Sequence, residues 1–424
     1  MNGISSIALA RPSLVVGAKE IAEAWGRMPR GIEHVRVPAW DEDGTTLAID
    51  AAKEALGRES GSALRVILAS GVDAAILAEA LGAHHARVLS VAGGIEALEA
   101  ALRLVDAPAL CVVSVVPASA PGSDARIEEA AGAAAFLVTA DGPLQLITSS
   151  TYVRAASPRG ELDADEPTRL ASERFVLPAD APLFVAGPAA LARVKSVRPA
   201  VDARKEWGAL GVLAPLVQLF ESLRQGAPKG GWCVVGDASA ERATFLALKV
   251  EGAGLVLTPP PERARRVSPT RALAESRELS QEPDSTMGAY VPAGTWVEDL
   301  PARLRLVAQQ CESCRRVMYP PRATCPDCRG RAFAGLTLPP TAIVYAATRI
   351  GRGGAPSEFA GEQTQTGAFW VGVVEWPEQR VRVTTRLIGY DEHGPNIGDP
   401  VRAVVRRLFE QEGAVRYGVK FGPV

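Results

Sequence analysis

The chain has 424 residues, of which 47% are hydrophobic and 5% aromatic, and its formal net charge is −2. This length accommodates two or three domains with ordinary apolar cores. Because no basic-then-apolar leader and no apolar run of ~20 residues occurs, we expect a cytoplasmic protein without a membrane segment. Residues 301–424 carry six more basic than acidic side chains, and residues 1–300 carry eight more acidic ones. This asymmetry suits an anionic ligand or an acidic partner but is too mild to indicate nucleic-acid binding.

Residues 1–255 alternate amphipathic helices with short strands rich in Val, Ile, Leu and Ala. This alternation is typical of an α/β layered domain. In chain order the pattern predicts a helix over 45–56, a strand over 64–70, a helix over 74–81, a strand over 88–91, a helix from 95 to about 104, and strands over 110–116 and 133–138. A shorter set follows, with strands over 183–185, 232–235 and 246–250 and a helix over about 210–223.

The composition changes after residue 255. Residues 256–297 contain three consecutive prolines and many charges but few large apolar side chains, so we expect a linker or an extended arm. Residues 337–424 contain short β-like runs separated by Gly, Pro and Asn, which predicts a small all-β barrel.

Between these regions, over residues 298–336, lie two CxxC pairs separated by ten residues: Cys311, Cys314, Cys325 and Cys328. Two such knuckles bring four thiolates to one tetrahedral ion, so the spacing predicts a zinc ribbon. A site with four thiolates has no open coordination position, and the zinc should therefore be structural. Two disulfides are the alternative, but nothing in the sequence suggests an oxidising compartment.

The C-terminal part, about 298–424, resembles the zinc-ribbon and OB-fold family that accompanies thiolases and hydroxymethylglutaryl-CoA (HMG-CoA) synthases. Besides the cysteines, the resemblance rests on Tyr319-Pro-Pro-Arg322, Ile343–Thr348 and Tyr417-Gly418. It implies an OB-fold over 337–424 that docks on a thiolase-fold subunit and helps to form its CoA channel.

The N-terminal part, 1–255, resembles the thiolase superfamily and, within it, the archaeal-type HMG-CoA synthases. Gly3-Ile4, Glu20–Gly26, Gly31–Glu33 and Asp41–Ala48 read like the opening of that branch. The resemblance implies a five-layered αβαβα sandwich with two pseudo-symmetric halves, about 1–145 and 146–255, in a protein that normally dimerises.

Catalysis in that superfamily uses a cysteine nucleophile, a histidine and an asparagine. The matching positions here are Val91, before Gly93-Gly94, and Ala186 and Ala209. A valine cannot form a thioester and an alanine cannot move a proton, so the resemblance predicts a thiolase-like domain without catalytic residues. Ser90 is the only nearby nucleophile, and no base for it is evident.

We therefore expect a non-catalytic accessory subunit that pairs with a catalytic thiolase-fold subunit in a hetero-oligomer. CoA or an acyl-CoA would be a ligand of that complex, through residues that the sequence does not identify. The alternative is a self-sufficient HMG-CoA synthase-like enzyme that condenses or cleaves acyl-CoA with non-standard residues, for which Ser90, His84 and His85 are the candidates.

Three further patterns have two interpretations each. The acidic run Asp41-Glu42-Asp43 could bind a cation, but an acidic run before a helix is favoured by the helix dipole. Gly351–Gly354 could hold a phosphate or be a flexible loop. A third function, nucleic-acid binding, would use barrel aromatics as stacking platforms, although we favour core or interface positions for them. These aromatics are Trp370, Trp376, Phe409 and Phe421.

Overall fold

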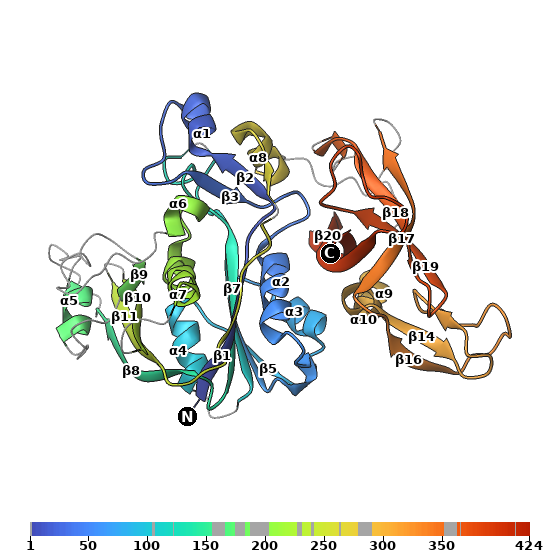
Figure 1. The fold of residues 1–424 in the computed structure, drawn as a ribbon, viewed down its shortest axis with the longest axis horizontal. Coiled ribbons are helices and arrows are strands. Elements are labelled where there is room, and N and C mark those ends of the chain that lie inside the picture. Colours follow the sequence, from blue (N-terminus) through green and yellow to red (C-terminus); the bar gives the residue numbers. More distant parts are fainter. Residues whose placement is uncertain are drawn as a thin grey trace. The chain divides into compact units, whose positions relative to one another are not determined.

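In a computed structural model the chain forms two compact units, one of residues 1–38 and 43–272 and one of residues 39–42 and 273–424 (Figure 1). The described residues are 2–103, 107–121, 123–154, 166–173, 183–186, 203–226, 231–238, 241–262, 264–278, 291–351, 363–364, 366–411 and 413–424. The finer domain boundaries expected from the sequence remain predictions. No helix of these residues is long and apolar enough to cross a membrane.

The first unit is built on a mixed sheet of ten strands. In spatial order these are β5 (Arg87–Ser90), β4 (Val66–Ser70), β6 (Ala109–Val115), β7 (Gly132–Ala140), β1 (Asn2–Ala10), β8 (Leu144–Val153), β11 (Arg242–Val250), β10 (Trp232–Ala238) and β9 (Leu183–Ala186), with β12 (Val256–Thr258) also paired to β1. The strands from β5 to β1 and those from β8 to β9 form two halves. Only two residue pairs, Gly3 with Gln145 and Ile4 with Leu144, join them.

The helices of this unit are α1 (Ala18–Trp25), α2 (Gly44–Leu56), α3 (Ala74–Leu81), α4 (Ile95–Arg103), α5 (Glu166–Glu173), α6 (Ala203–Trp207), α7 (Ala214–Arg224) and α8 (Pro269–Glu275), with 3-10 turns η1 (Gly61–Ala63) and η3 (Gly211–Leu213). Helix α4 contacts β4 and β6 in one half of the sheet and β8 and β11 in the other. Figure 1 shows α4 and α7 between the two halves. This is the layered arrangement expected from the sequence.

Small side chains allow the layers to pack closely. Four alanines of α2 and three consecutive alanines of β7 (Ala133–Ala135) are almost fully buried. The start of α2 is fixed by a capping box, in which the Asp43 carboxylate accepts from the Thr46 amide at 2.9 Å and Thr46 Oγ1 accepts from the Asp43 amide. Beside the large sheet, β2 (Leu14–Gly17), β3 (His34–Val37) and β13 (Arg265–Arg266) form a sheet of three strands.

The second unit begins with α9 (Ala293–Glu298) and α10 (Leu300–Arg305), which precede a three-stranded ribbon of β14 (Val307–Cys311), β15 (Val317–Met318) and β16 (Phe333–Thr337). A closed five-stranded barrel follows, as the sequence predicts. Its order is β17 (Thr341–Ile350), β18 (Phe369–Trp376), β19 (Val381–Leu387), β21 (Ala414–Pro423) and β20 (Pro400–Gln411).

The barrel core contains two of the aromatic side chains that nucleic-acid binding would have used. Trp376 and Phe421 are buried and pack edge to face, with ring centroids 5.8 Å apart. Tyr319, from the Tyr-Pro-Pro motif of the ribbon, packs on Trp376 at 6.0 Å, and its hydroxyl donates to the Ala302 carbonyl at 3.0 Å. Since these rings are inside the unit, Trp376 and Phe421 cannot serve as stacking platforms.

Residues 39–42 cluster with the barrel. Lys420 Nζ donates to the Asp41 carboxylate at 2.9 Å, and the Arg407 amide donates to the Asp41 carbonyl. Glu42 lies 3.8 Å from Arg406. The acidic run is thus divided between two uses: Asp43 caps α2, whereas Asp41 and Glu42 neutralise buried cations of β20 and β21.

Candidate functional site

The three residues that the sequence analysis places at the family's catalytic positions lie at the ends of elements of the first unit. Val91 directly follows β5, and its amide donates to the Ala69 carbonyl at 2.9 Å. Ala186 is the last residue of β9 and pairs with Asp237 of β10. Ala209 lies before η3, where its amide donates to the Glu128 carbonyl at 2.6 Å.

Two glycines show that these elements meet at the start of α4. A Cβ added to Gly94 would lie 2.5 Å from the Val212 carbonyl oxygen, in the turn that follows Ala209. A Cβ on Gly93 would lie 2.2 Å from a Glu96 carboxylate oxygen and 3.4 Å from Arg242 Nη2. The segment after Val91 therefore packs against η3 on one side and against β11 on the other.

A polar cluster occupies this meeting point. The Glu96 carboxylate is 2.9 Å from Arg242 Nη2 and accepts from Thr244 Oγ1 at 3.3 Å. Its side chain is only 17% exposed. Burial, and then the Glu96 charge, raises the pKa of Asp237, although Arg242 acts in the opposite direction. Two carboxyl groups thus share one guanidinium beside the substituted positions.

Sequence reasoning missed this cluster. The available signal was an acidic residue in the first turn of an amphipathic helix, flanked by Ile95, Ala97 and Leu98, which are all buried. By contrast, the nucleophile and histidine candidates do not converge on the site. Ser90 is exposed on β5, and His84 is an exposed side chain 3.4 Å from Glu79.

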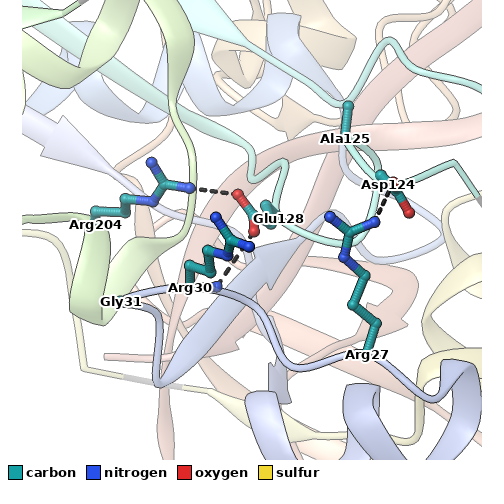
Figure 2. A pocket seen from close by; sticks show the side chains of 7 residues that line it. All are labelled: Arg27, Arg30, Gly31, Asp124, Ala125, Glu128 and Arg204. Atoms are coloured by element: carbon teal, nitrogen blue, oxygen red, sulfur yellow. Dashed lines mark hydrogen bonds and ion pairs between the residues drawn. The ribbon is translucent and has the colours of Figure 1, made fainter. Parts of the chain in front are cut away.

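A separate open pocket of about 680 Å³ lies on the first unit (Figure 2). Its charged lining comes from the segment after α1, the loop before β7, and α6: Arg27, Arg30, Asp124, Glu128 and Arg204. Figure 2 shows Arg27 paired with Asp124 and Arg204 paired with Glu128, while the Arg30 amide donates to Glu128 at 3.2 Å. Three guanidinium groups against two carboxylates leave the pocket with one excess positive charge.

The four cysteines of the ribbon converge as predicted. Their sulfur atoms all lie within 4.8 Å of one another, with Cys311 Sγ 3.5 Å from Cys328 Sγ and Cys314 Sγ 3.5 Å from Cys325 Sγ. Zinc–thiolate bonds of about 2.3 Å place the sulfurs of a tetrahedron ~3.8 Å apart, so the geometry fits a zinc ion. Cys311 and Cys325 are buried, whereas Cys314 and Cys328 are exposed.

Backbone amides favour the thiolate form of the two buried cysteines. The amide of Cys314 lowers the pKa of Cys311 to about 7, and the amide of Cys328 lowers the pKa of Cys325. A lowered pKa favours the thiolate, which is the form that binds zinc. Cys111 and Cys233, the two cysteines outside the ribbon, are inert, since burial raises the pKa of both thiols to about 12.

Two expectations fall partly outside the described residues. The glycine-rich segment 351–354 is described only at Gly351, and the expected linker 256–297 is described except for residues 263 and 279–290.

Comparison with known proteins assigns the ribbon and the family. Residues 299–334 match the family model for the rubredoxin-like zinc ribbon domain of ChsH2. A DUF35 domain-containing scaffold protein of Methanothermobacter thermautotrophicus is 30% identical over 132 residues, which are 30% of this chain and 93% of the relative. The chain belongs to the DUF35 domain-containing family. A second DUF35 scaffold protein, from Methanocaldococcus jannaschii, is 29% identical over 125 residues, covering 29% of this chain and 84% of that protein.

Solved structures show a second fold in this DUF35 protein, besides the zinc ribbon. An HMG-CoA synthase complexed with CoA has a TM-score of 0.56 and 18% identity, covering 69% of this chain and 94% of that one. Smu.943c from Streptococcus mutans UA159 has a TM-score of 0.56 and 19% identity, covering 67% of this chain and 93% of that one. At this identity the likeness shows the fold alone. The DUF35 protein thus combines a thiolase-like unit with a zinc ribbon and a β-barrel.

Proposed function

We propose that the chain is a non-catalytic accessory subunit that docks on a catalytic thiolase-fold partner and shapes its acyl-CoA channel. The observation that carries this proposal is the identity of the residues at the three predicted catalytic positions. Val91, Ala186 and Ala209 stand at element ends that meet around the start of α4, yet none of them offers a nucleophile, a base or a hydrogen-bonding side chain. The scaffold names of the archaeal relatives agree with such a role.

The β5 edge of the large sheet is the surface that we propose for docking. β5 pairs with β4 on one side and ends the sheet on the other. Arg87, Val88 and Ser90 are exposed, although strands inside a layered α/β sheet are normally buried on both faces. An open edge is a template for pairing with a strand of another chain, and a partner of the same fold would present a matching edge.

The pocket of Figure 2 is the place that we propose for the anionic part of CoA. Its excess positive charge and its guanidinium groups suit phosphate oxygens, which arginine binds in a bidentate manner. Because Arg27 and Arg204 already contact carboxylates, Arg30 is the side chain most available to a ligand.

Purification of the tagged chain from its native host tests the proposal. We expect recovery of a thiolase-fold subunit with an intact cysteine and histidine, and acyl-CoA cleavage or condensation only when both chains are present. Val88→Lys, on the β5 edge, should abolish recovery of that subunit. Val256→Lys, on β12, is the matched control, since Val256 is 53% exposed in the same unit, and it should leave recovery unchanged. Turnover by the purified chain alone would contradict the proposal.

The polar cluster favours one alternative, a self-sufficient lyase with acid–base chemistry. Asp237, whose pKa is raised, and Glu96 could exchange a proton with a substrate beside Arg242. Glu96→Gln and Asp237→Asn distinguish the two functions. If the purified chain cleaves acyl-CoA and both variants lose that activity, the alternative is correct; if the chain is inactive without a partner, it is wrong.

A further inference from the structure

Arg36 is a buried cation that forms no ion pair with any of the described residues. It lies on β3, where it pairs with Val15 of β2, and its carbonyl accepts from the Ala131 amide at 2.9 Å. The residue is 7% exposed, and its Nε and Nη1 atoms are buried without a hydrogen-bond partner among the described residues. A buried charge is normally paired, because removing it from water is costly.

A second arginine lies near it. Arg11, in the connection from β1 to β2, is half-buried, and its guanidinium lies over Trp207 of α6 at 5.9 Å from the ring centroid. Its Nε donates to the Pro261 carbonyl at 3.5 Å, and the charges of Glu262, Glu206 and Glu221 act on it without forming an ion pair among the described residues. Burial, and then the Arg11 charge, lowers the pKa of Arg36 to about 10, while Glu206 acts in the opposite direction. The two cations therefore repel each other in a poorly solvated region.

Two other arginines with little-exposed side chains have acidic partners. Arg154, at the end of β8, is 9% exposed in its side chain and lies 3.0 Å from the Glu166 carboxylate. Arg406 of the barrel lies 3.8 Å from Glu42. Arg36 has no such acidic contact, so an anion is the missing component.

We propose that Arg36, together with Arg11, binds a small oxyanion or the anionic group of a ligand, a phosphate or a carboxylate. A guanidinium offers a planar fork of donors that matches both groups. Two such side chains would compensate a phosphate dianion, and an anion between them would convert their repulsion into attraction. The site goes beyond the proposed function, and Arg36 is not among the residues that line the pocket of Figure 2.

Thermal unfolding of the purified full chain, without any partner, tests this site. Inorganic phosphate, acetate and CoA are compared with chloride at equal ionic strength, and hydrogen exchange over β2 and β3 reports the local effect. A ligand that binds only the folded state raises the unfolding temperature with its concentration. We expect phosphate or acetate to raise it for the wild type, and Arg36→Met to remove the response. Without added anion this variant should be at least as stable as the wild type, because an unpaired charge has been deleted.

Arg154→Met is the matched control, in which a buried arginine with a carboxylate partner is replaced. It should unfold at a lower temperature yet keep the full anion response. If Arg36→Met does not fold, equilibrium dialysis of radiolabelled phosphate against the wild type and Arg11→Met decides, with weaker binding expected for Arg11→Met. A response to CoA that Arg36→Met lacks supports the site, with the anion belonging to CoA. No response of the wild type beyond that to chloride, or a response that Arg36→Met retains, would overturn it.

Discussion

At the scale of single residues, the first unit holds a charged cluster of Glu96, Arg242 and Asp237 near the three positions that the sequence predicts to lack catalytic side chains. Val91, Ala186 and Ala209 are predicted from the family resemblance, which depends on motifs along the chain. Glu96 and Asp237 could not be paired in the same way, since they come from opposite halves of the unit and meet only when α4 packs on β11. Ionised Asp237 should cost stability, because burial and the Glu96 charge both oppose its ionisation.

We therefore predict that Asp237→Asn stabilises the first unit at neutral pH. The raised pKa of Asp237 means that the folded state binds its proton more tightly than the unfolded state does. Its contribution to stability is therefore most favourable at low pH and declines as the pH rises through the raised value. The gain from Asn should be present at pH 7 and vanish below about pH 4, the ordinary range of an aspartate. Urea unfolding across this pH range measures it, and an equal gain at all pH values would contradict the assignment.

At the scale of elements, the barrel includes a segment that is distant in sequence. The Lys420 side chain on β21 is 2% exposed, and its partner Asp41 lies 379 residues earlier. Burial opposes ionisation of Asp41, but Lys420, Arg406 and Arg386 together outweigh it and lower the pKa of the carboxyl. No pattern within residues 337–424 shows that β21 needs an acidic partner, because a lysine in a strand ordinarily faces solvent.

Breaking this pair should be strongly destabilising. Asp41→Asn removes the carboxylate that lies 2.9 Å from the buried Lys420 ammonium, which we expect to cost about 3–5 kcal/mol. Since the pKa of Asp41 is depressed in the folded state, the stabilisation is complete above pH ~4 and is lost as the pH falls through that depressed value. Hydrogen exchange over β20 and β21 reports the effect. The double variant Asp41→Asn with Lys420→Met should recover most of the loss, and equal losses in the single and double variants would refute the pairing.

At the scale of the whole molecule, two structural modules with different sources of stability share one chain. The first unit depends on extensive burial of alanine, valine and leucine between layers, whereas the ribbon buries little besides Cys311, Met318 and Cys325. A cluster of that size cannot offset the entropy of ordering the ribbon, so the metal must contribute.

Cys325→Ser should therefore release zinc and unfold the ribbon while leaving the first unit folded. We expect loss of exchange protection over β14 to β16 and unchanged protection over β1 and β7, together with loss of partner recovery. Cys233→Ala is the control, because Cys233 is a buried thiol outside the ribbon, and it should retain one zinc per chain. A metal-free Cys325→Ser protein that keeps its ribbon protection would show that zinc is dispensable.

The sequence by itself determined the features whose signals are local. The ribbon follows from four cysteines at fixed spacing, the barrel from alternating short strands, and the layered α/β unit from helix and strand periodicity, because each depends on neighbours along the chain. Only the tertiary structure decided which charges meet. The Glu96–Arg242–Asp237 cluster, the Asp41–Lys420 pair and the unpaired Arg36 each depend on packing between distant segments. Electrostatic energy depends on distance and burial in space, neither of which the order of residues specifies.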